Sequence, residues 1–98
     1  MQALTGQQRK HLWSLAHALQ PVCYVGKYGL SEALVESVRV ALDDHELIKV
    51  KFNDHKEEKK ALAAELEALT DSNLVGMIGN IAIMYRQQPD EEKRRISL

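Results

Sequence analysis

The sequence predicts a single α/β domain in which helices pack on a four-stranded mixed sheet. Three segments carry apolar residues at the spacing of a helix face, two shorter segments have the composition of strands, and two apolar runs flank a glycine-asparagine pair. The resulting order is α-β-α-β-α-β-β. Strand–helix–strand units favour parallel strands joined by right-handed crossovers, and the last two strands add an antiparallel hairpin.

The first predicted helix begins after Thr5. Thr5 and Gln8 match the T-x-x-Q capping box, in which two side chains satisfy backbone N–H groups at a helix start. Pro21 ends the helix near Leu19 or Gln20. The residues predicted to face the core are Leu12, Leu15, Ala16 and Leu19. The outer surface is predicted to carry Arg9, Lys10 and Trp13 or His17.

A strand and a second helix follow the first helix. The β-prone run from Val22 to Val25 is long enough for a buried strand. After a short loop, Ser31 can cap the second helix, which the Asp43-Asp44-His45 stretch ends. The predicted buried side of this helix consists of Leu30, Leu34, Val35, Val38, Ala41 and Leu42.

The stretch from Leu47 to Asn53 alternates with a period of two, which predicts a strand with one buried and one polar side. Lys49 and Lys51 fall on the polar side, opposite Ile48, Val50 and Phe52.

Asp54 with Glu57 indicates a further helix cap, and the third helix then extends to about Leu69. Its predicted inner positions are Leu62, Leu66 and Leu69, with Ala61 and Ala68 nearby.

The final elements are a hairpin and a charged tail. A turn at Thr70–Asn73 precedes the apolar runs Leu74–Ile78 and Ile81–Tyr85, which flank Gly79-Asn80, a frequent hairpin turn. We assign residues 1–88 to one domain and residues 89–98 to a charged, mobile tail.

The composition fits one small globular domain. The chain has 98 residues, of which 45% are hydrophobic and 28% charged, with a net charge of −1. No apolar stretch approaches the roughly 20 residues that span a membrane, and the N-terminus lacks the layout of a signal peptide. The single cysteine, Cys23, excludes an internal disulfide. We expect a cytoplasmic protein without a membrane partner.

The residue pattern gives no positive evidence for catalysis. The four histidines lack the spacing of metal ligands, and Asp43 to Glu46 is interpreted as a polar helix end. Cys23 lies within a predicted strand, with no neighbour that would lower its pKa. We therefore expect no enzyme activity, no metal, no cofactor and no small-molecule substrate.

The Gly26-Lys27-Tyr28-Gly29 loop is the main candidate for binding. It lacks the third glycine of the Rossmann fingerprint and does not match a P-loop. It still precedes a helix N-terminus, where free N–H groups favour an anion. Lys27 adds a cation, and Tyr28 adds a ring that can stack on a base or sugar. KH domains clamp nucleic-acid backbone with a loop of the same G-x-x-G form. The alternative is a plain strand-to-helix turn.

Other cations could join this loop. Together with Lys27, the basic residues of the first helix and the second strand could form one cationic face on an otherwise neutral domain. The sequence leaves their convergence open. These residues are Arg9, Lys10, Lys49 and Lys51.

Most of the chain resembles the CRM domain, an RNA-binding module named for chloroplast RNA splicing and ribosome maturation. Between Leu4 and Phe52 the matching pieces are QRKHL, LAHALQPV, VGKYGLSE and ELIKVKF, in that order and spacing. LVGMIGNIAIMYR continues the match to about residue 86. A free-standing domain of this length is similar to the small bacterial YhbY type.

This resemblance implies an α/β fold similar to the C-terminal domain of translation initiation factor three. It also implies RNA binding and, for stand-alone bacterial members, association with precursors of the large ribosomal subunit. The family's loop maps onto Gly26, Lys27, Tyr28 and Gly29, and its basic positions map onto Arg9, Lys10, Lys49 and Lys51.

The expected function is therefore that of a monomeric RNA-binding protein that assists assembly of the large ribosomal subunit by holding structured ribosomal RNA. One alternative is a protein-interaction module that docks a basic ribosomal protein through the acidic third helix. The acidic residues in question are Glu57, Glu58, Glu65 and Glu67. A small enzyme is the other alternative.

Overall fold

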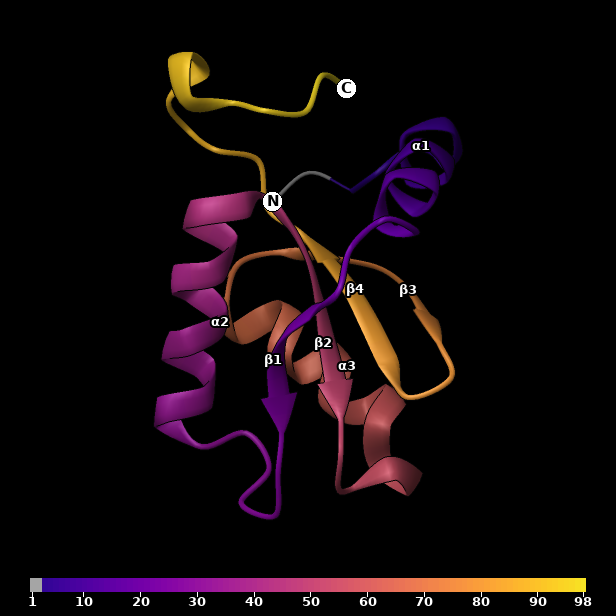
Figure 1. Ribbon diagram of the computed structural model, residues 1–98, viewed down its shortest axis with the longest axis vertical. Coiled ribbons are helices and arrows are strands. Elements are labelled where there is room, and N and C mark those ends of the chain that lie inside the picture. The colour runs from indigo at the N-terminus through magenta and orange to yellow at the C-terminus, as the bar shows by residue number, and fades with distance from the viewer. Residues whose placement is uncertain (1–2) are drawn as a thin grey trace.

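The computed structural model describes residues 3–98, so the first two residues of the predicted 1–88 domain lie outside the described part. The predicted order of elements is confirmed (Figure 1). The helices are α1 (Gly6–Ala16), α2 (Glu32–His45) and α3 (Lys59–Leu69), with short 3-10 helices η1 (Lys56–Glu58) and η2 (Glu91–Lys93). The strands are β1 (Pro21–Val25), β2 (Leu47–Phe52), β3 (Asn73–Ile78) and β4 (Ile81–Tyr85).

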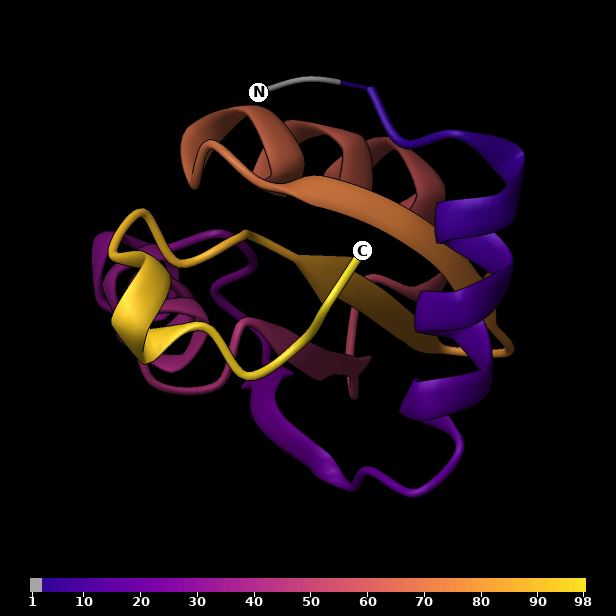
Figure 2. The same ribbon diagram turned by 90° about the horizontal axis from the view of Figure 1, so that it is seen from above.

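Within the described residues, the four strands form one mixed sheet in the order β1-β2-β4-β3. β1 runs parallel to β2, whereas β4 is antiparallel to both β2 and β3. The β3–β4 hairpin turns at Gly79, whose φ of +57° favours glycine. Helices α2 and α3 lie on one face of the sheet and α1 on the other (Figure 2). The mixed α/β fold predicted from the sequence is confirmed.

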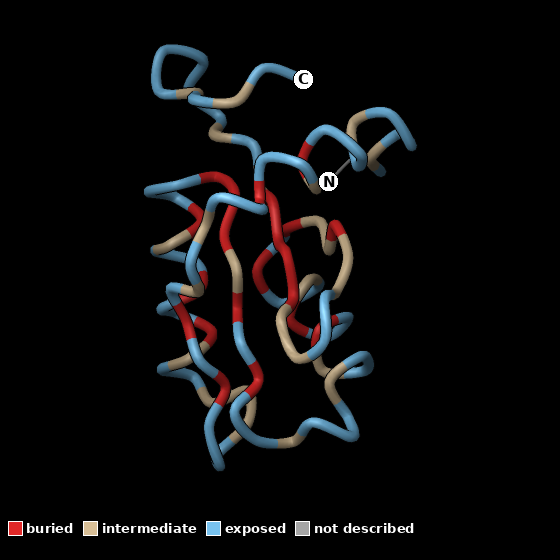
Figure 3. The backbone as a smooth tube through the Cα atoms, turned by 45° about the vertical axis from the view of Figure 1, so that its right-hand side comes forward, coloured by how far each residue is buried: buried red, intermediate tan, exposed pale blue. Residues whose placement is uncertain are grey.

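The larger of two clusters of buried residues lies between the sheet and the helices α2 and α3. The alternation predicted for β2 is confirmed, since Ile48, Val50 and Phe52 are buried here. The predicted inner side of α2 is also confirmed. Its fully or largely buried members are Val35, Val38 and Leu42, and its partly buried members are Leu30, Leu34 and Ala41. Figure 3 shows buried residues along the strands and the inner sides of the helices.

The smaller cluster of buried residues lies between α1 and the other face of the sheet. Thr5 and Gln8 form the predicted capping box, and Leu12 and Ala16 are completely buried. Trp13 packs closely against Gly76 of β3. A Cβ built at Gly76 would lie only 2.6 Å from a carbon of the Trp13 ring, so the ring can approach only because this residue is glycine. Trp13 therefore belongs to the α1–sheet contact, and His17 is the exposed member of the predicted pair.

Two predictions about α1 are wrong. The helix ends at Ala16 and not near Leu19, and Leu15 is 39% exposed. Helix α1 contacts the sheet through Leu12 and Ala16, four residues apart, so Leu15 lies on its flank.

The predicted start of α3 is also wrong. The Asp54 carboxylate accepts a hydrogen bond from the N–H of His55, the next residue, and caps no helix. His55 has a φ of +54°, and η1 precedes α3. At the other end of α3, Leu69 is 42% exposed and Ala63 takes an inner position instead. The leucine spacing therefore indicated the helix but placed one core position incorrectly.

Glu46 attaches the C-terminal segment to the end of α2. Its side chain is almost completely buried, and its carboxylate accepts hydrogen bonds from three backbone N–H groups of that segment. These donors are Gln88 at 2.9 Å, Arg95 at 2.6 Å and Ile96 at 3.1 Å. Residues 89–98 can therefore move as predicted only when these three hydrogen bonds are broken.

Glu46→Ala is expected to release the C-terminal segment and to lower the free energy of unfolding by roughly 1–3 kcal/mol, because hydrogen bonds to a charged acceptor are lost. Hydrogen exchange should speed up at the amides of Gln88, Arg95 and Ile96. Glu46→Gln keeps one acceptor oxygen and should show a smaller change. Equal exchange in Glu46→Ala and the wild type would mean that this segment is already free in solution.

Candidate nucleic-acid interface

The loop between β1 and α2 is a tight turn closed by its two glycines. The N–H of Gly29 donates to the carbonyl oxygen of Gly26 at 3.0 Å. Gly29 has a φ of +62°, a conformation that L-residues with a Cβ rarely adopt. Gly26 has no positive φ, and no described atom lies within 4 Å of a Cβ built there. The turn therefore requires glycine at Gly29, whereas Gly26 leaves exposed backbone that a ligand can approach.

The segment after β2 holds this loop in place. The N–H groups of Asn53 and Asp54 donate to the carbonyl oxygen of Val25 at 3.0 and 3.2 Å. A ring nitrogen of His55, Nε2, lies 2.8 Å from the carbonyl oxygen of Lys27. No signal in the sequence marks His55 as part of the site, because its contact is 28 residues away and follows no local motif. The loop is therefore held at the carbonyl of Val25, where it leaves β1, and at the carbonyl of Lys27.

The side chains at the tip of the loop are exposed, so a ligand can contact them. Tyr28 is 80% exposed, and the neighbouring Lys27 is also exposed. The Lys27 ammonium lies 5.1 Å from the centroid of the Tyr28 ring. A cation–π contact at an exposed site contributes only about 0.5–1 kcal/mol, so a phosphate can compete for the ammonium.

The start of α2 adds a weaker attraction for anions. Ser31 caps the helix as predicted, accepting a hydrogen bond from the N–H of Leu34 at 3.2 Å. The remaining N–H groups of the first turn favour a negative charge. Glu32 places a carboxylate in the same turn and opposes this effect. Lys27 is therefore the residue of the loop itself that attracts an anion most directly.

Two of the predicted basic residues bind backbone carbonyls within the domain. The Arg9 guanidinium donates to the carbonyl oxygens of Leu74 and Val75 at 2.8 and 2.6 Å, which ties α1 to β3. The Lys49 ammonium donates to the carbonyl oxygen of Leu19 at 3.0 Å. Both side chains hold α1 and its following turn on the sheet, so part of their hydrogen-bonding capacity is already used.

The structure brings Lys51, but not the basic residues of α1, to the same end of the molecule as the loop. Lys51 is exposed on β2 and pairs in register with Tyr24, which precedes Gly26 by two residues. Lys10 is exposed on α1, which lies towards the opposite end of the 37 Å long axis (Figure 1). The clustered candidates are therefore Gly26, Lys27, Tyr28, Gly29 and Lys51.

The acidic residues considered as a protein-docking surface are not all available. Glu57, Glu58 and Glu65 are exposed, but the Glu67 carboxylate accepts a hydrogen bond from the backbone N–H of Leu74. Glu67 thus links α3 to β3 and has a role within the fold.

Comparison with known proteins identifies the family. The CRS1 / YhbY (CRM) domain family matches residues 4–86, which is most of the chain. The chain belongs to the CRM domain family.

The similar proteins have names that refer to RNA binding. This CRM domain is 42% identical to probable RNA-binding protein PA4753 of Pseudomonas aeruginosa, over 93% of this chain and 88% of that protein. It is 36% identical to probable RNA-binding protein YqeI of Bacillus subtilis, over 97% of this chain and 98% of that protein. The solution structure of SAV1595 from Staphylococcus aureus, described as a candidate RNA-binding protein, superposes with a TM-score of 0.80 at 34% identity, over 97% of this chain and 100% of that chain. None of these names describes an enzyme, in agreement with the sequence prediction.

Within residues 3–98, no three His, Cys, Asp or Glu side chains gather as metal ligands. The same residues include no helix with the length and apolar character needed to cross a membrane. Burial raises the pKa of the Cys23 thiol, against a weaker effect of the hydrogen bond from Ser37, so the reactive thiolate is disfavoured.

The two loop glycines of the CRM domain are expected to respond differently to substitution. Gly29→Ala should lower the free energy of unfolding by about 1–2 kcal/mol, because alanine is strained at its positive φ. Gly26→Ala should leave stability within about 0.5 kcal/mol but weaken RNA binding if RNA backbone approaches this point. Thermal melts and RNA titrations of both variants test the pair. A destabilised Gly26→Ala variant would contradict the geometry.

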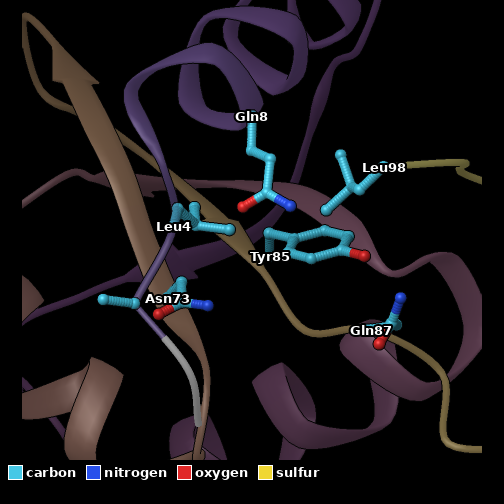
Figure 4. Close-up of a pocket in the computed structure, with 7 residues that line it drawn as sticks. Leu4, Gln8, Asn73, Tyr85, Gln87 and Leu98 are labelled. Atoms are coloured by element: carbon cyan, nitrogen blue, oxygen red, sulfur yellow. The ribbon is translucent and has the colours of Figure 1, made fainter.

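A separate pocket lies where the start of α1 meets the adjoining ends of β3 and β4 and the C-terminal residue (Figure 4). It has a volume of about 250 Å³ and is lined by Ala3, Leu4, Gln8, Asn73, Tyr85, Gln87 and Leu98. The Tyr85 hydroxyl is buried there without a hydrogen-bond partner among the described residues. Burial raises the pKa of Tyr85, helped by the negative charge of Glu46 and opposed by Arg94.

Tyr85→Phe is expected to stabilise the domain by about 1 kcal/mol, because it removes a buried hydroxyl that lacks a partner. The effect should grow in alkaline solution. Since the pKa of Tyr85 is raised on folding, the unfolded chain ionises first above about pH 10, and the wild type loses stability there. Urea unfolding at pH 7 and pH 10.5 checks both points. A less stable variant at both pH values would show that the hydroxyl does have a partner.

Proposed function

We propose that this CRM domain binds structured ribosomal RNA and assists assembly of the large ribosomal subunit. The observation that carries the proposal is the turn from Gly26 to Gly29. Its backbone is fixed by Gly29 and by the segment after β2, while Lys27 and Tyr28 project freely into solvent. A rigid turn with an exposed cation costs little ordering entropy when it meets a phosphate.

The proposed mechanism is electrostatic and geometric. RNA backbone passes over the exposed surface of Gly26, a phosphate lies at the Lys27 ammonium, and the Tyr28 ring packs on a sugar or base. Lys51 holds a neighbouring phosphate. Phosphate contacts position an RNA without reading its sequence, so recognition depends on the shape of folded RNA.

Several observations support RNA as the partner. The similar proteins from Pseudomonas aeruginosa and Bacillus subtilis are named as probable RNA-binding proteins. The net charge of −1 disfavours non-specific coating of nucleic acid and leaves binding to a local cationic surface. The choice of ribosomal RNA, the precursor of the large subunit, a monomeric state and a cytoplasmic location all rest on the family resemblance and on the composition of the chain.

Sedimentation of cell lysate through a sucrose gradient tests this function. The protein should migrate with particles of the large subunit or its precursors and return to the top of the gradient after ribonuclease treatment. The variant Lys27→Glu, which alters an exposed side chain, should remain at the top without ribonuclease. Migration with large particles that persists after complete RNA digestion would instead indicate binding to a protein.

A further inference from the structure

Helix α1 leaves one end of its side of the sheet uncovered. The strand register places Tyr24, Lys51, Ile81 and Ile78 in one row across all four strands. Tyr24 is 53% exposed and Ile78 41% exposed, Lys51 is exposed and Ile81 half-buried. The next row contains Gly76, over which Trp13 of α1 packs. The uncovered row therefore lies just beyond the part of the sheet that α1 covers.

Tyr24 is held in an orientation that suits stacking. Its neighbours Cys23 and Val25 are buried on the side of α2 and α3, so the tyrosine ring lies on the opposite face. Its hydroxyl donates to the carbonyl oxygen of Pro21, three residues earlier on the same strand, at 3.3 Å. This bond directs the ring along β1. Because 53% of Tyr24 is exposed, its ring keeps surface that a base can contact.

The charge around Tyr24 fits a polyanion. Lys51 is its partner in the strand register, and Lys27 follows it by three residues in the loop. Within the described residues, the uncovered row contains a lysine and no carboxylate. An exposed aromatic ring with lysines on the neighbouring strand and in the adjoining loop is a combination with which proteins bind single-stranded nucleic acid. These cations favour RNA over an apolar protein segment as the occupant.

We propose that the base of an unpaired nucleotide stacks on Tyr24, with an adjacent phosphate at Lys51, immediately beside the RNA backbone held at the Gly26–Gly29 loop. This inference rests on the proposed function and adds the class of RNA to it. Bases inside a duplex cannot reach a protein ring, so the preferred RNA has a folded part with an unpaired extension or bulge next to it.

Two RNA hairpins with the same stem test the inference. One ends bluntly, and the other carries an unpaired 3′ extension of a few nucleotides. The wild type should bind the extended hairpin more tightly than the blunt one. Tyr24→Ala should weaken binding of the extended hairpin by roughly five- to a hundredfold, the range expected for one stacked base, and leave the blunt hairpin unchanged.

Two control variants separate stacking from a general loss of structure. Tyr24→Phe keeps the ring and should keep most of the preference for the extension. Val40→Ala removes an apolar side chain of similar exposure on the outer side of α2. This substitution should leave the affinity for both hairpins unchanged. Cross-linking from 5-iodouridine in the extension should recover the peptide that contains Tyr24 from the wild type.

The outcomes distinguish this inference from the function on which it rests. If the wild type binds neither hairpin, the proposed function fails and the inference fails with it. If the wild type binds both hairpins and Tyr24→Ala binds each of them as tightly as the wild type does, the function stands and the inference is overturned. A protein is then the remaining occupant of the face. An equal loss on both hairpins would also overturn it, because the ring would then contact the stem.

Discussion

Lys27→Glu is expected to weaken binding of structured RNA by about thirtyfold at low salt while leaving the thermal melt unchanged. Two unit charges about 4 Å apart in water interact by about 1 kcal/mol, so reversing one of them changes the energy by about 2 kcal/mol. Each 1.4 kcal/mol corresponds to about a tenfold change in affinity. Lys27 contacts the fold through its backbone carbonyl, and its side chain is exposed. Exposed charge changes usually alter stability by less than about 0.5 kcal/mol.

A second charge reversal controls for the overall change in charge. Lys60→Glu has the same effect on net charge and alters an exposed lysine of α3. Its RNA affinity should fall far less than that of Lys27→Glu. Similar losses in both variants would mean that RNA responds to net charge alone. Unchanged affinity in Lys27→Glu, beside an unchanged melt, would make the loop a plain turn.

Phe52→Ala is expected to lower the free energy of unfolding by about 3–5 kcal/mol, the usual cost of truncating a fully buried phenylalanine. Small domains are stable by only about 5–15 kcal/mol, so this loss is a large share of the total. Phe52 is the last residue of β2, and the residues that hold the loop follow it directly. Urea or thermal unfolding measures the change.

The matched control for Phe52 is Leu69→Ala, which removes a large apolar side chain that is 42% exposed. It should cost much less than Phe52→Ala. Comparable costs for both variants would contradict the assignment of Phe52 to the core. RNA affinity of folded Phe52→Ala should also fall, because the segment after β2 supports the Gly26–Gly29 loop.

The fold was predictable from the sequence because its periodicities are local. The alternation of Ile48, Val50 and Phe52 determines which face of β2 is buried, without reference to any tertiary contact. The capping box at Thr5 and Gln8 and the hairpin turn at Gly79-Asn80 depend on residues within a few positions of one another. Leu15 and Leu69 were assigned to the core because a helical pattern does not reveal how wide a stripe the neighbouring sheet covers.

The candidate site was predictable only in part, because its contacts join distant segments. The loop itself was visible as a local motif, and its position before α2 is confirmed. Its support by His55 depends on a contact across 28 residues. Arg9 and Lys49 were grouped with the loop on charge alone, whereas their side chains donate to carbonyl groups that the tertiary fold places beside them. Glu46 was interpreted as part of a polar helix end, since the segment that buries it follows about 40 residues later.

The dependence of RNA affinity on salt concentration tests the central claim, that Lys27 holds an RNA phosphate, most directly. Each neutralised phosphate contributes about 0.7–0.9 to the slope of log affinity against log salt concentration. The slope for Lys27→Ala should therefore be shallower than that of the wild type by about this amount, with the same loss of affinity for RNAs of different sequence. Identical slopes for the two proteins would contradict a phosphate contact at Lys27.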